Sequence, residues 1–179
     1  MKLNLLNIQP IKKIPDRLIY LNSVNKTMRP EQLKYIIFST KTGKHEGEML
    51  CHKTKMNLRD DYNGSSLAVD FLMANKRKQG VGTAFINFAK FLSRQMGCNG
   101  HIVLKADPFF TPNSAPHVFY RKCGFSTLDK KQDKKIDNYI KKHKDANWKD
   151  MLPTLMFYPE YHEKKQSFIK TLFKFFRVN

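Results

Sequence analysis

The stretch NKRKQGVGTAFINFAKFL at residues 75–92 joins a cationic glycine turn directly to a segment with helical periodicity. Three cations precede Gly80 and Gly82, and apolar residues then recur every three or four positions as far as Met96. A helix start presents unpaired backbone N–H groups and a partial positive charge. The stretch therefore predicts an anion-binding helix start, and an ordinary glycine turn beside solvated cations is the structural alternative.

Two strand-like runs flank this stretch. The apolar run 66–73 comes before the turn, and the run 101–107 follows the helix, which we expect over 83–96 with Gly97 as its stop. A strand, a crossover helix and a second strand make a unit in which the two strands pair in parallel. We therefore expect a β-α-β unit at the centre of the fold.

Other segments predict strands and helices on both sides of this unit, although the N-terminal third carries few signals. The alternation predicts one α/β or α+β domain, 1–179, with a mixed sheet. A single core suits a chain of 179 residues of which 41% are hydrophobic. The further elements that we expect are strands at 34–40, 48–53 and 152–158, helices at 114–122 and 133–145, and a basic amphipathic C-terminal helix within 161–179.

The charge balance is strongly basic. Lys and Arg number 33 against 15 Asp and Glu, so the formal net charge of +18 gives a surface that attracts anions such as phosphates, nucleic acids or acidic proteins. Three cysteines without CxxC spacing predict reduced thiols. The sequence contains no apolar signal core and no run of roughly 18 apolar residues, so we expect a cytoplasmic protein.

Two common phosphate-binding motifs do not fit the turn. The P-loop spacing GxxxxGK[ST] does not occur in the sequence. A dinucleotide-binding motif would place its third glycine at position 85, where Phe85 would obstruct the close packing of helix on strand. The cationic residues before Gly80 also suit a ligand with more phosphate groups than NAD. A dinucleotide enzyme is therefore disfavoured.

Two segments resemble motifs of the GNAT superfamily of acyl-CoA-dependent N-acetyltransferases. RKQGVG at 77–82 matches the acyl-CoA-binding pattern [QR]-x-x-G-x-[GA] in its usual place between a strand and a long helix. NSAPHVFYRKCGF at 113–125 resembles the pattern N-x-x-A-x-x-[FL]-Y-x-x-x-G-F, with Pro116 in the place of the alanine. The resemblance implies a GNAT-like mixed, mostly antiparallel sheet of six or seven strands, flanked by helices, around the β-α-β unit.

The resemblance also implies acetyl-CoA as the cosubstrate and direct acetyl transfer to an amine without a metal. The turn would hold the coenzyme pyrophosphate, and the end of the preceding strand would bind the pantetheine arm and stabilise the oxyanion. Asn113 would approach the pantetheine, and Tyr120 would approach the thioester sulfur. The implied coenzyme residues are Leu72, Met73, Arg77, Lys78, Gln79, Gly80, Val81, Gly82, Thr83 and Asn113.

The resemblance leaves the general base unassigned. Some members use a glutamate on the strand before the turn, and Ser66 occupies that position here. Asp70 on the same strand is the first candidate, because a carboxylate in an apolar strand is costly unless it is paired or protonated. An ion pair with a lysine of a neighbouring strand is the structural alternative, and Asp107 is the other candidate base. No spacing pairs the histidines with a carboxylate, so we expect structural or surface roles for His52, His101 and His117.

The predicted function is acetyl transfer to an amine acceptor of unknown identity, either a small molecule or a protein. The alternative is a basic nucleic-acid-binding or ribosome-associated protein on the same fold with a vestigial coenzyme site. The lysine-rich segment 129–149 has few interleaved aromatic residues, so we expect a solvated face and no specific nucleic-acid binding. We expect the C-terminal helix to pack on its own domain or in a homodimer rather than on a membrane.

Overall fold

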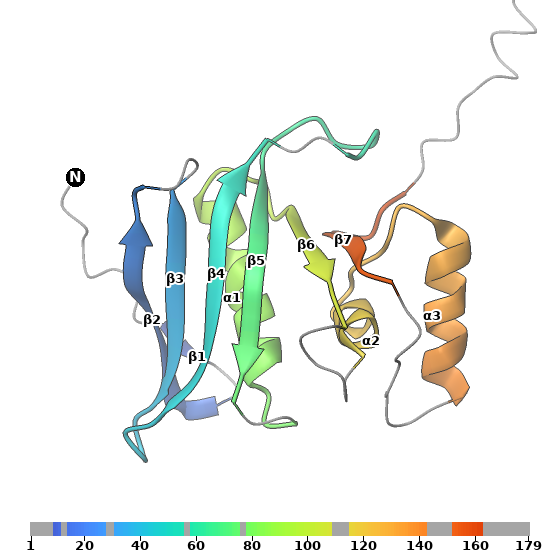
Figure 1. The fold of residues 1–179 in the computed structure, drawn as a ribbon. Helices are drawn as coiled ribbons and strands as arrows, with labels where there is room; N and C mark the ends of the chain where they lie inside the picture. Colours follow the sequence, from blue (N-terminus) through green and yellow to red (C-terminus); the bar gives the residue numbers. More distant parts are fainter. Residues whose placement is uncertain are drawn as a thin grey trace, which may run out of the picture.

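The computed structural model describes residues 9–11, 14–27, 31–55, 58–75, 78–108, 115–142 and 152–162. Arg77 and Asn113, two of the predicted coenzyme residues, lie outside the described residues, as does most of the predicted C-terminal helix. The elements in chain order are β1 (Gln9–Ile11), β2 (Ile14–Asn25), β3 (Gln32–Ser39), β4 (His45–Thr54), β5 (Ser66–Ala74), α1 (Val81–Gln95), β6 (Ile102–Ala106), α2 (Pro116–Lys122), α3 (Lys130–Lys142) and β7 (Thr154–Tyr158) (Figure 1).

The strands form one seven-stranded sheet whose order follows the chain from β1 to β7. Neighbouring strands are antiparallel except β5 and β6, which are parallel because the chain crosses between them through α1. This topology confirms the predicted mixed, mostly antiparallel sheet with a central β-α-β unit. The 12-residue strand β2 is an addition, since the N-terminal segment carries too few signals to predict it.

Helix α1 begins at the predicted change from glycine turn to helical periodicity. Its first residue is Val81 rather than 83, because Gly80 takes the left-handed conformation, with φ at 78°, and directly precedes the helix. The face that repeats at helical spacing is buried, and Phe85, Phe88 and Leu92 are at most 6% exposed. Helix α1 therefore supplies one wall of the core.

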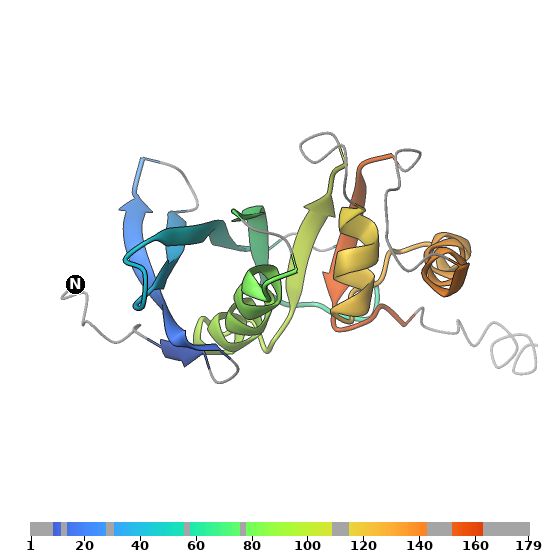
Figure 2. The same ribbon diagram turned by 90° about the horizontal axis from the view of Figure 1, so that it is seen from below.

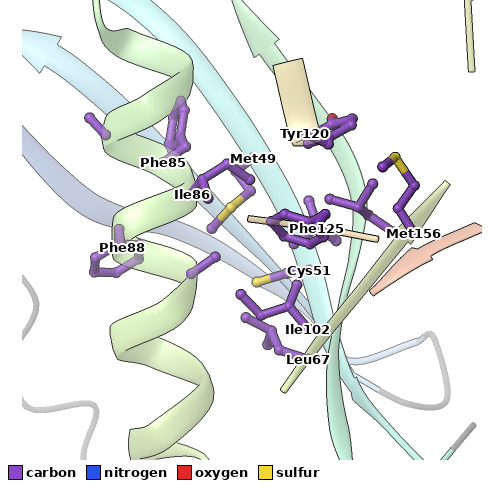
Figure 3. Packing of buried hydrophobic residues seen from close by; sticks show 14 of the residues in the cluster. Met49, Cys51, Leu67, Phe85, Ile86, Phe88, Ile102, Tyr120, Phe125 and Met156 are labelled. Atoms are coloured by element: carbon purple, nitrogen blue, oxygen red, sulfur yellow. The ribbon is translucent and has the colours of Figure 1, made fainter. Parts of the chain in front are cut away.

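The sheet supplies the other wall of the core (Figure 3). In β3 and β4 burial alternates with period two, so that Tyr35, Met49 and Cys51 are buried on the face that packs against α1. Phe125 and Met156 belong to the same cluster and extend it toward β7. One continuous core thus joins the strands on both sides of the β-α-β unit.

The opposite face of β3, β4 and β5 carries the side chains that alternate with the core residues. On it, Nζ of Lys34 lies 2.6 Å from Oε2 of Glu48, and His52 follows on the same side of β4. Among the described residues no helix covers this face, since α1 lies behind the sheet in Figure 1 and on one side of it in Figure 2. We call this surface the open face; its polar residues are Gln32, Lys34, Glu48, His52 and Asp70.

Arg121 connects α2 to α3 and to the end of β7. Its Nε and Nη2 donate to the two carboxylate oxygens of Asp137 at 2.8 and 2.9 Å. Its Nη1 donates to the Phe125 carbonyl at 3.2 Å and to Glu160 Oε1 at 3.3 Å. The Arg121 side chain is 15% exposed, so these bonds are shielded from water and fix the position of α2.

The remaining general features agree with the composition. Cys51, Cys98 and Cys123 are free thiols, as expected. None of the helices in the described ranges is long and apolar enough to cross a membrane.

Candidate active site

Strands β5 and β6 pair over only a short distance. Their register runs from Leu67 opposite Ile102 to Val69 opposite Leu104. Beyond Val69, β5 continues to Ala74 with β4 as its partner. Figure 1 shows the ribbons of β5 and β6 diverging toward the end of the sheet at which α1 begins. We call this divergence the split of the sheet.

An extra residue in β5 marks the start of the split. Leu50 of β4 lies opposite Phe71, but the next residue, Cys51, lies opposite Val69, so Asp70 has no opposite residue in β4. Such a β-bulge bends its strand and increases the local twist, and bulges are common beside active sites. The bulge at Asp70 therefore gives a physical reason for the separation of β5 from β6.

The first turn of α1 presents backbone donors at the same end of the sheet. The first helical hydrogen bond runs from the Ala84 N–H to the Gly80 carbonyl at 2.9 Å, so the amides of Val81, Gly82 and Thr83 come before the helical ladder. Among the described residues no side chain caps this end, and the first turn contains no acidic residue. The positive end of the helix dipole is therefore suited to an anion such as a phosphate.

Hydrogen bonds attach the turn before α1 to strands β2 and β4. The Asn75 N–H donates to the Glu46 carbonyl at 2.8 Å, and its side-chain amide donates to the His45 carbonyl at 2.8 Å. Arg17 of β2 forms an ion pair with Glu46 and donates to Oε1 of Gln79 at 3.4 Å. Arg17 thus adds a cation beside the predicted phosphate turn, and no sequence motif indicated it.

Gly82 has a packing role in addition to the one predicted for it. A Cβ atom built on Gly82 would lie 3.0 Å from Cζ of Phe119 in α2, which is closer than an ordinary contact. The sequence indicated only that a glycine would let phosphate approach the backbone. The structure adds that this glycine lets α1 and α2 approach each other.

Tyr120 lies in α2 with its ring in the core. The ring centroid is 5.1 Å from that of Phe119 and 5.8 Å from that of Phe125, and Figure 3 shows the side chain at the edge of the buried cluster. Within the described part of the chain its hydroxyl has no hydrogen-bond partner. Burial raises the pKa of Tyr120, and the neighbouring Cys123 adds to the effect, so the hydroxyl stays protonated and can donate a hydrogen bond.

The two strand residues predicted to bind the pantetheine arm lie in the diverging part of β5. Leu72 packs against the core, and Met73 is 39% exposed. A Cβ atom on Gly47 of β4 would lie 2.4 Å from the Met73 carbonyl oxygen, so this glycine lets β4 approach closely. The opposite edge of this part of β5 faces the split.

Asp70 is paired with Gln32 and His52. The structural alternative to its role as a base had been an ion pair with a lysine of a neighbouring strand. Oδ2 of Asp70 accepts a hydrogen bond from Gln32 Nε2 at 2.9 Å and lies 2.7 Å from His52 Nδ1. The expectation that no histidine is paired with a carboxylate is therefore wrong for His52. This pair joins residues 18 positions apart and depends on the bulge, so sequence spacing gave no signal of it. The other candidate base, Asp107, lies 3.4 Å from Lys105 Nζ.

The other two histidines have the structural roles expected of them. The ring of His101 stacks on Tyr62 with 3.4 Å between centroids. Nε2 of His117 lies 3.1 Å from the Leu152 carbonyl oxygen. Burial lowers the pKa of both histidines, which favours their neutral forms.

No family model and no curated protein sequence matches the chain. The solved structures that it is similar to are GNAT acetyltransferases. One is a histone acetyltransferase HPA2 and related acetyltransferase from Corynebacterium glutamicum, at 15% identity and a TM-score of 0.43, over 74% of this chain and 67% of that chain. Another is Naa50 of Arabidopsis thaliana in complex with a bisubstrate analogue, at 19% identity and a TM-score of 0.42, over 69% of this chain and 70% of that chain.

A third similar structure is AtaTR bound with acetyl-CoA, at 17% identity and a TM-score of 0.41, over 61% of this chain and 74% of that chain. Such distant likeness to GNAT structures does not identify the reaction or the substrate of this chain. The reaction of this chain is therefore inferred from the residues around the split.

Proposed function

We propose that this chain is an acetyl-CoA-dependent N-acetyltransferase that transfers an acetyl group directly to a primary amine. The observation that carries the proposal is the split between β5 and β6, which opens toward the uncapped start of α1. A ligand with phosphates at one end and an extended arm at the other fits this arrangement, because the helix start can hold the phosphates while the arm lies along β5.

In this proposal the coenzyme phosphates bind the backbone amides of the first turn of α1. The turn residues of the motif, Arg77, Lys78 and Gln79, add charge and polar groups beside them. The arm follows β5 from Ala74 toward Asp70, a distance of four residue steps that span about 13 Å at the usual strand rise of roughly 3.3 Å per residue. The thioester therefore lies near the closed end of the split, with Asn113 of the second motif beside the arm.

Residues of the diverging part of β5 and of α2 have complementary tasks. A backbone amide of Leu72 or Met73 stabilises the negative charge that develops on the carbonyl oxygen. Tyr120 donates a hydrogen bond to the departing sulfur, a role that suits a hydroxyl held in its protonated form by burial. Asp70 lies on the side of β5 at which the acceptor amine loses its proton.

The acceptor is an amine on a small molecule or on a protein. It approaches from the open face, which no helix covers among the described residues. A cavity closed on all sides would restrict the acceptor to small amines, whereas an uncovered sheet face also admits a polypeptide. No metal takes part in the proposed transfer, because an amine attacks a thioester without one.

The first test is ligand-dependent stability. Acetyl-CoA at about 100 times its Kd stabilises the folded state by about 2.7 kcal/mol. For a chain of this size we therefore expect a rise in Tm of roughly 5–10 °C, and no rise with NAD. Thr83→Pro removes one amide of the helix start without breaking a helical bond and should reduce the shift. Thr83→Ala keeps the amide and should retain it.

The second test is turnover. Release of free coenzyme from acetyl-CoA is measured over a panel of small amines and peptides with free N-termini or lysines. Amine-dependent release supports the proposal. A Tm rise with NAD equal to that with acetyl-CoA contradicts it. Tight binding of generic RNA at physiological salt also contradicts the proposal if acetyl-CoA does not affect it. Such binding would favour the nucleic-acid-binding alternative.

A further inference from the structure

We infer that His52 is the general base of this reaction, that Asp70 positions it, and that the acceptor amine reaches it across the open face. This inference rests on the proposed acetyl transfer and deepens it. It changes the role of Asp70 from proton acceptor to positioning residue. The carrying observation is the short contact between His52 Nδ1 and Asp70 Oδ2, at 2.7 Å, where the split begins.

The hydrogen bonds of Asp70 determine how His52 carries its proton. Asp70 Oδ2 accepts from Gln32 Nε2 at 2.9 Å, so the carboxylate is an acceptor toward both neighbours. His52 therefore donates from Nδ1, and in the neutral ring the lone pair is on Nε2. This tautomer is the one that a histidine base needs, since a carboxylate behind the ring also stabilises the imidazolium that forms.

The free ring nitrogen of His52 is accessible. In the described part of the chain, the buried side-chain nitrogens without a hydrogen-bond partner are Nδ1 of His101 and of His117. Nε2 of His52 has no hydrogen-bond partner there and is not one of these buried atoms, so it reaches solvent. The side chain of His52 is 22% exposed, enough for an amine to approach.

Three other charged residues of β3 and β4 have partners of their own. On the same face as His52, Lys34 of β3 and Glu48 of β4 pair with each other at 2.6 Å. Lys53, the next residue of β4, donates from Nζ to the Met96 carbonyl at 2.8 Å on the α1 side. In the part of the chain that the structure describes, Asp70 is the ionisable group that contacts the ring of His52 directly.

Cys51, the neighbour of His52, does not compete for the reaction. It is fully buried in the core, and burial raises the pKa of its thiol to about 12, with a smaller contribution from Asp70. A thiol in this state is neither a base nor a nucleophile at neutral pH. This favours direct transfer to the amine over an acetylated Cys51.

The proposed step is a direct acyl transfer from sulfur to nitrogen. The acceptor nitrogen forms a bond to the acetyl carbonyl carbon while the bond from that carbon to the coenzyme sulfur breaks. Nε2 of His52 takes the proton that the acceptor nitrogen loses. The departing thiolate, which accepts a hydrogen bond from the Tyr120 hydroxyl, receives a proton from solvent. The products are the N-acetylated amine, the free coenzyme thiol and, after proton release to water, the starting form of His52.

The test compares His52→Ala with His45→Ala, a change of another histidine on the same strand. With the best amine from the panel, we expect His52→Ala to lower kcat/KM by about 10²-fold, the usual contribution of a general base. It should also remove the acidic limb of the pH profile. Added imidazole should restore activity at least tenfold, which a purely structural role would not explain. His45→Ala should retain activity within threefold.

Asp70→Asn completes the test, because an amide can stabilise the wrong tautomer of His52. We expect a loss of activity without a loss of the acetyl-CoA Tm shift. The inference is overturned, while the proposed function stands, if His52→Ala keeps kcat/KM within threefold of wild type. It is also overturned if His52→Ala has low activity, an unchanged pH profile and no rescue by imidazole. Absence of amine-dependent turnover in the wild type, despite a panel of reactive amines, overturns both.

Discussion

Gly82 of α1 and Phe119 of α2 lie in close contact, with Phe119 Cζ only 3.0 Å from the position that a Cβ on Gly82 would occupy. Gly82 lies at the helix start that follows β5, and Phe119 lies in the helix that follows β6. The contact therefore connects the two sides of the split at its open end. A side chain at position 82 would push them apart.

We expect Gly82→Val to lower the free energy of unfolding by about 1–3 kcal/mol, the usual cost of added atoms in a packed contact. Denaturant unfolding measures the change. Thr83→Val is the matched control, since it places the same β-branched side chain at the next, exposed position. Phe119→Leu should recover part of the loss when it is combined with Gly82→Val. Equal unfolding midpoints for the two valine variants would show that Phe119 moves aside freely.

Tyr120→Phe keeps the buried ring and removes only the hydroxyl. We expect turnover to fall by about 10²-fold, because the departing sulfur loses its hydrogen-bond donor. The Tm and the Tm shift with acetyl-CoA should change little, since the hydroxyl has no hydrogen-bond partner in the described residues. Single-turnover measurements test this at the chemical step. Turnover within a few-fold of wild type would reduce Tyr120 to a packing residue.

The stability of the fold should depend on pH through His117. This side chain is fully buried, and desolvation lowers its pKa, partly offset by its hydrogen bond to Leu152 and by Asp107. The unfolded chain therefore binds the proton more readily than the folded one. The resulting stability is present above the ordinary histidine pKa of about 6.5 and is lost as the pH falls below it.

Between pH 7 and pH 5 we expect the free energy of unfolding to fall, by at most about 1.4 kcal/mol per pH unit for one such proton. His117→Gln keeps a donor for the Leu152 carbonyl and should reduce this dependence, leaving the contribution of His101, whose pKa is also lowered by burial. His45→Gln, at an exposed position, should leave the dependence unchanged. Chemical denaturation at a series of pH values measures the slope, and a slope that His117→Gln leaves unchanged would assign the dependence to another group.

Arg121→Met should be the most destabilising change on α2 that leaves the apolar core intact. It removes the partner of Asp137 and leaves the largely buried carboxylate of Asp133 without the nearby positive charge. We expect a loss of about 3 kcal/mol, since breaking a shielded ion pair leaves an uncompensated charge. Lys122→Met, one residue away and exposed, should stay within about 0.5 kcal/mol of wild type in denaturant unfolding.

Local sequence determined the central unit of the fold. Helical periodicity from Val81 onward, a glycine with positive φ at position 80 and an apolar run on either side are properties of consecutive residues, so α1 and its two strands were predicted close to their observed bounds. The strands expected at 34–40 and 48–53 followed from the same local rules, and in the structure they pair as β3 and β4. Strand β2 was missed because apolar and polar residues alternate only weakly along it. It is stabilised as a strand by its pairing with β3 in the sheet.

Tertiary structure alone decided the details of the candidate site. One additional residue in β5 shifts its register against β4, and this shift opens the split and brings Asp70 to His52. Arg17 reaches Gln79 from a strand 62 positions away in sequence. The sequence by itself determined which backbone segments form and that a phosphate-binding turn precedes a long helix. Which side chains meet around that turn depends on strand register, and register is fixed only when many distant apolar side chains pack together at once.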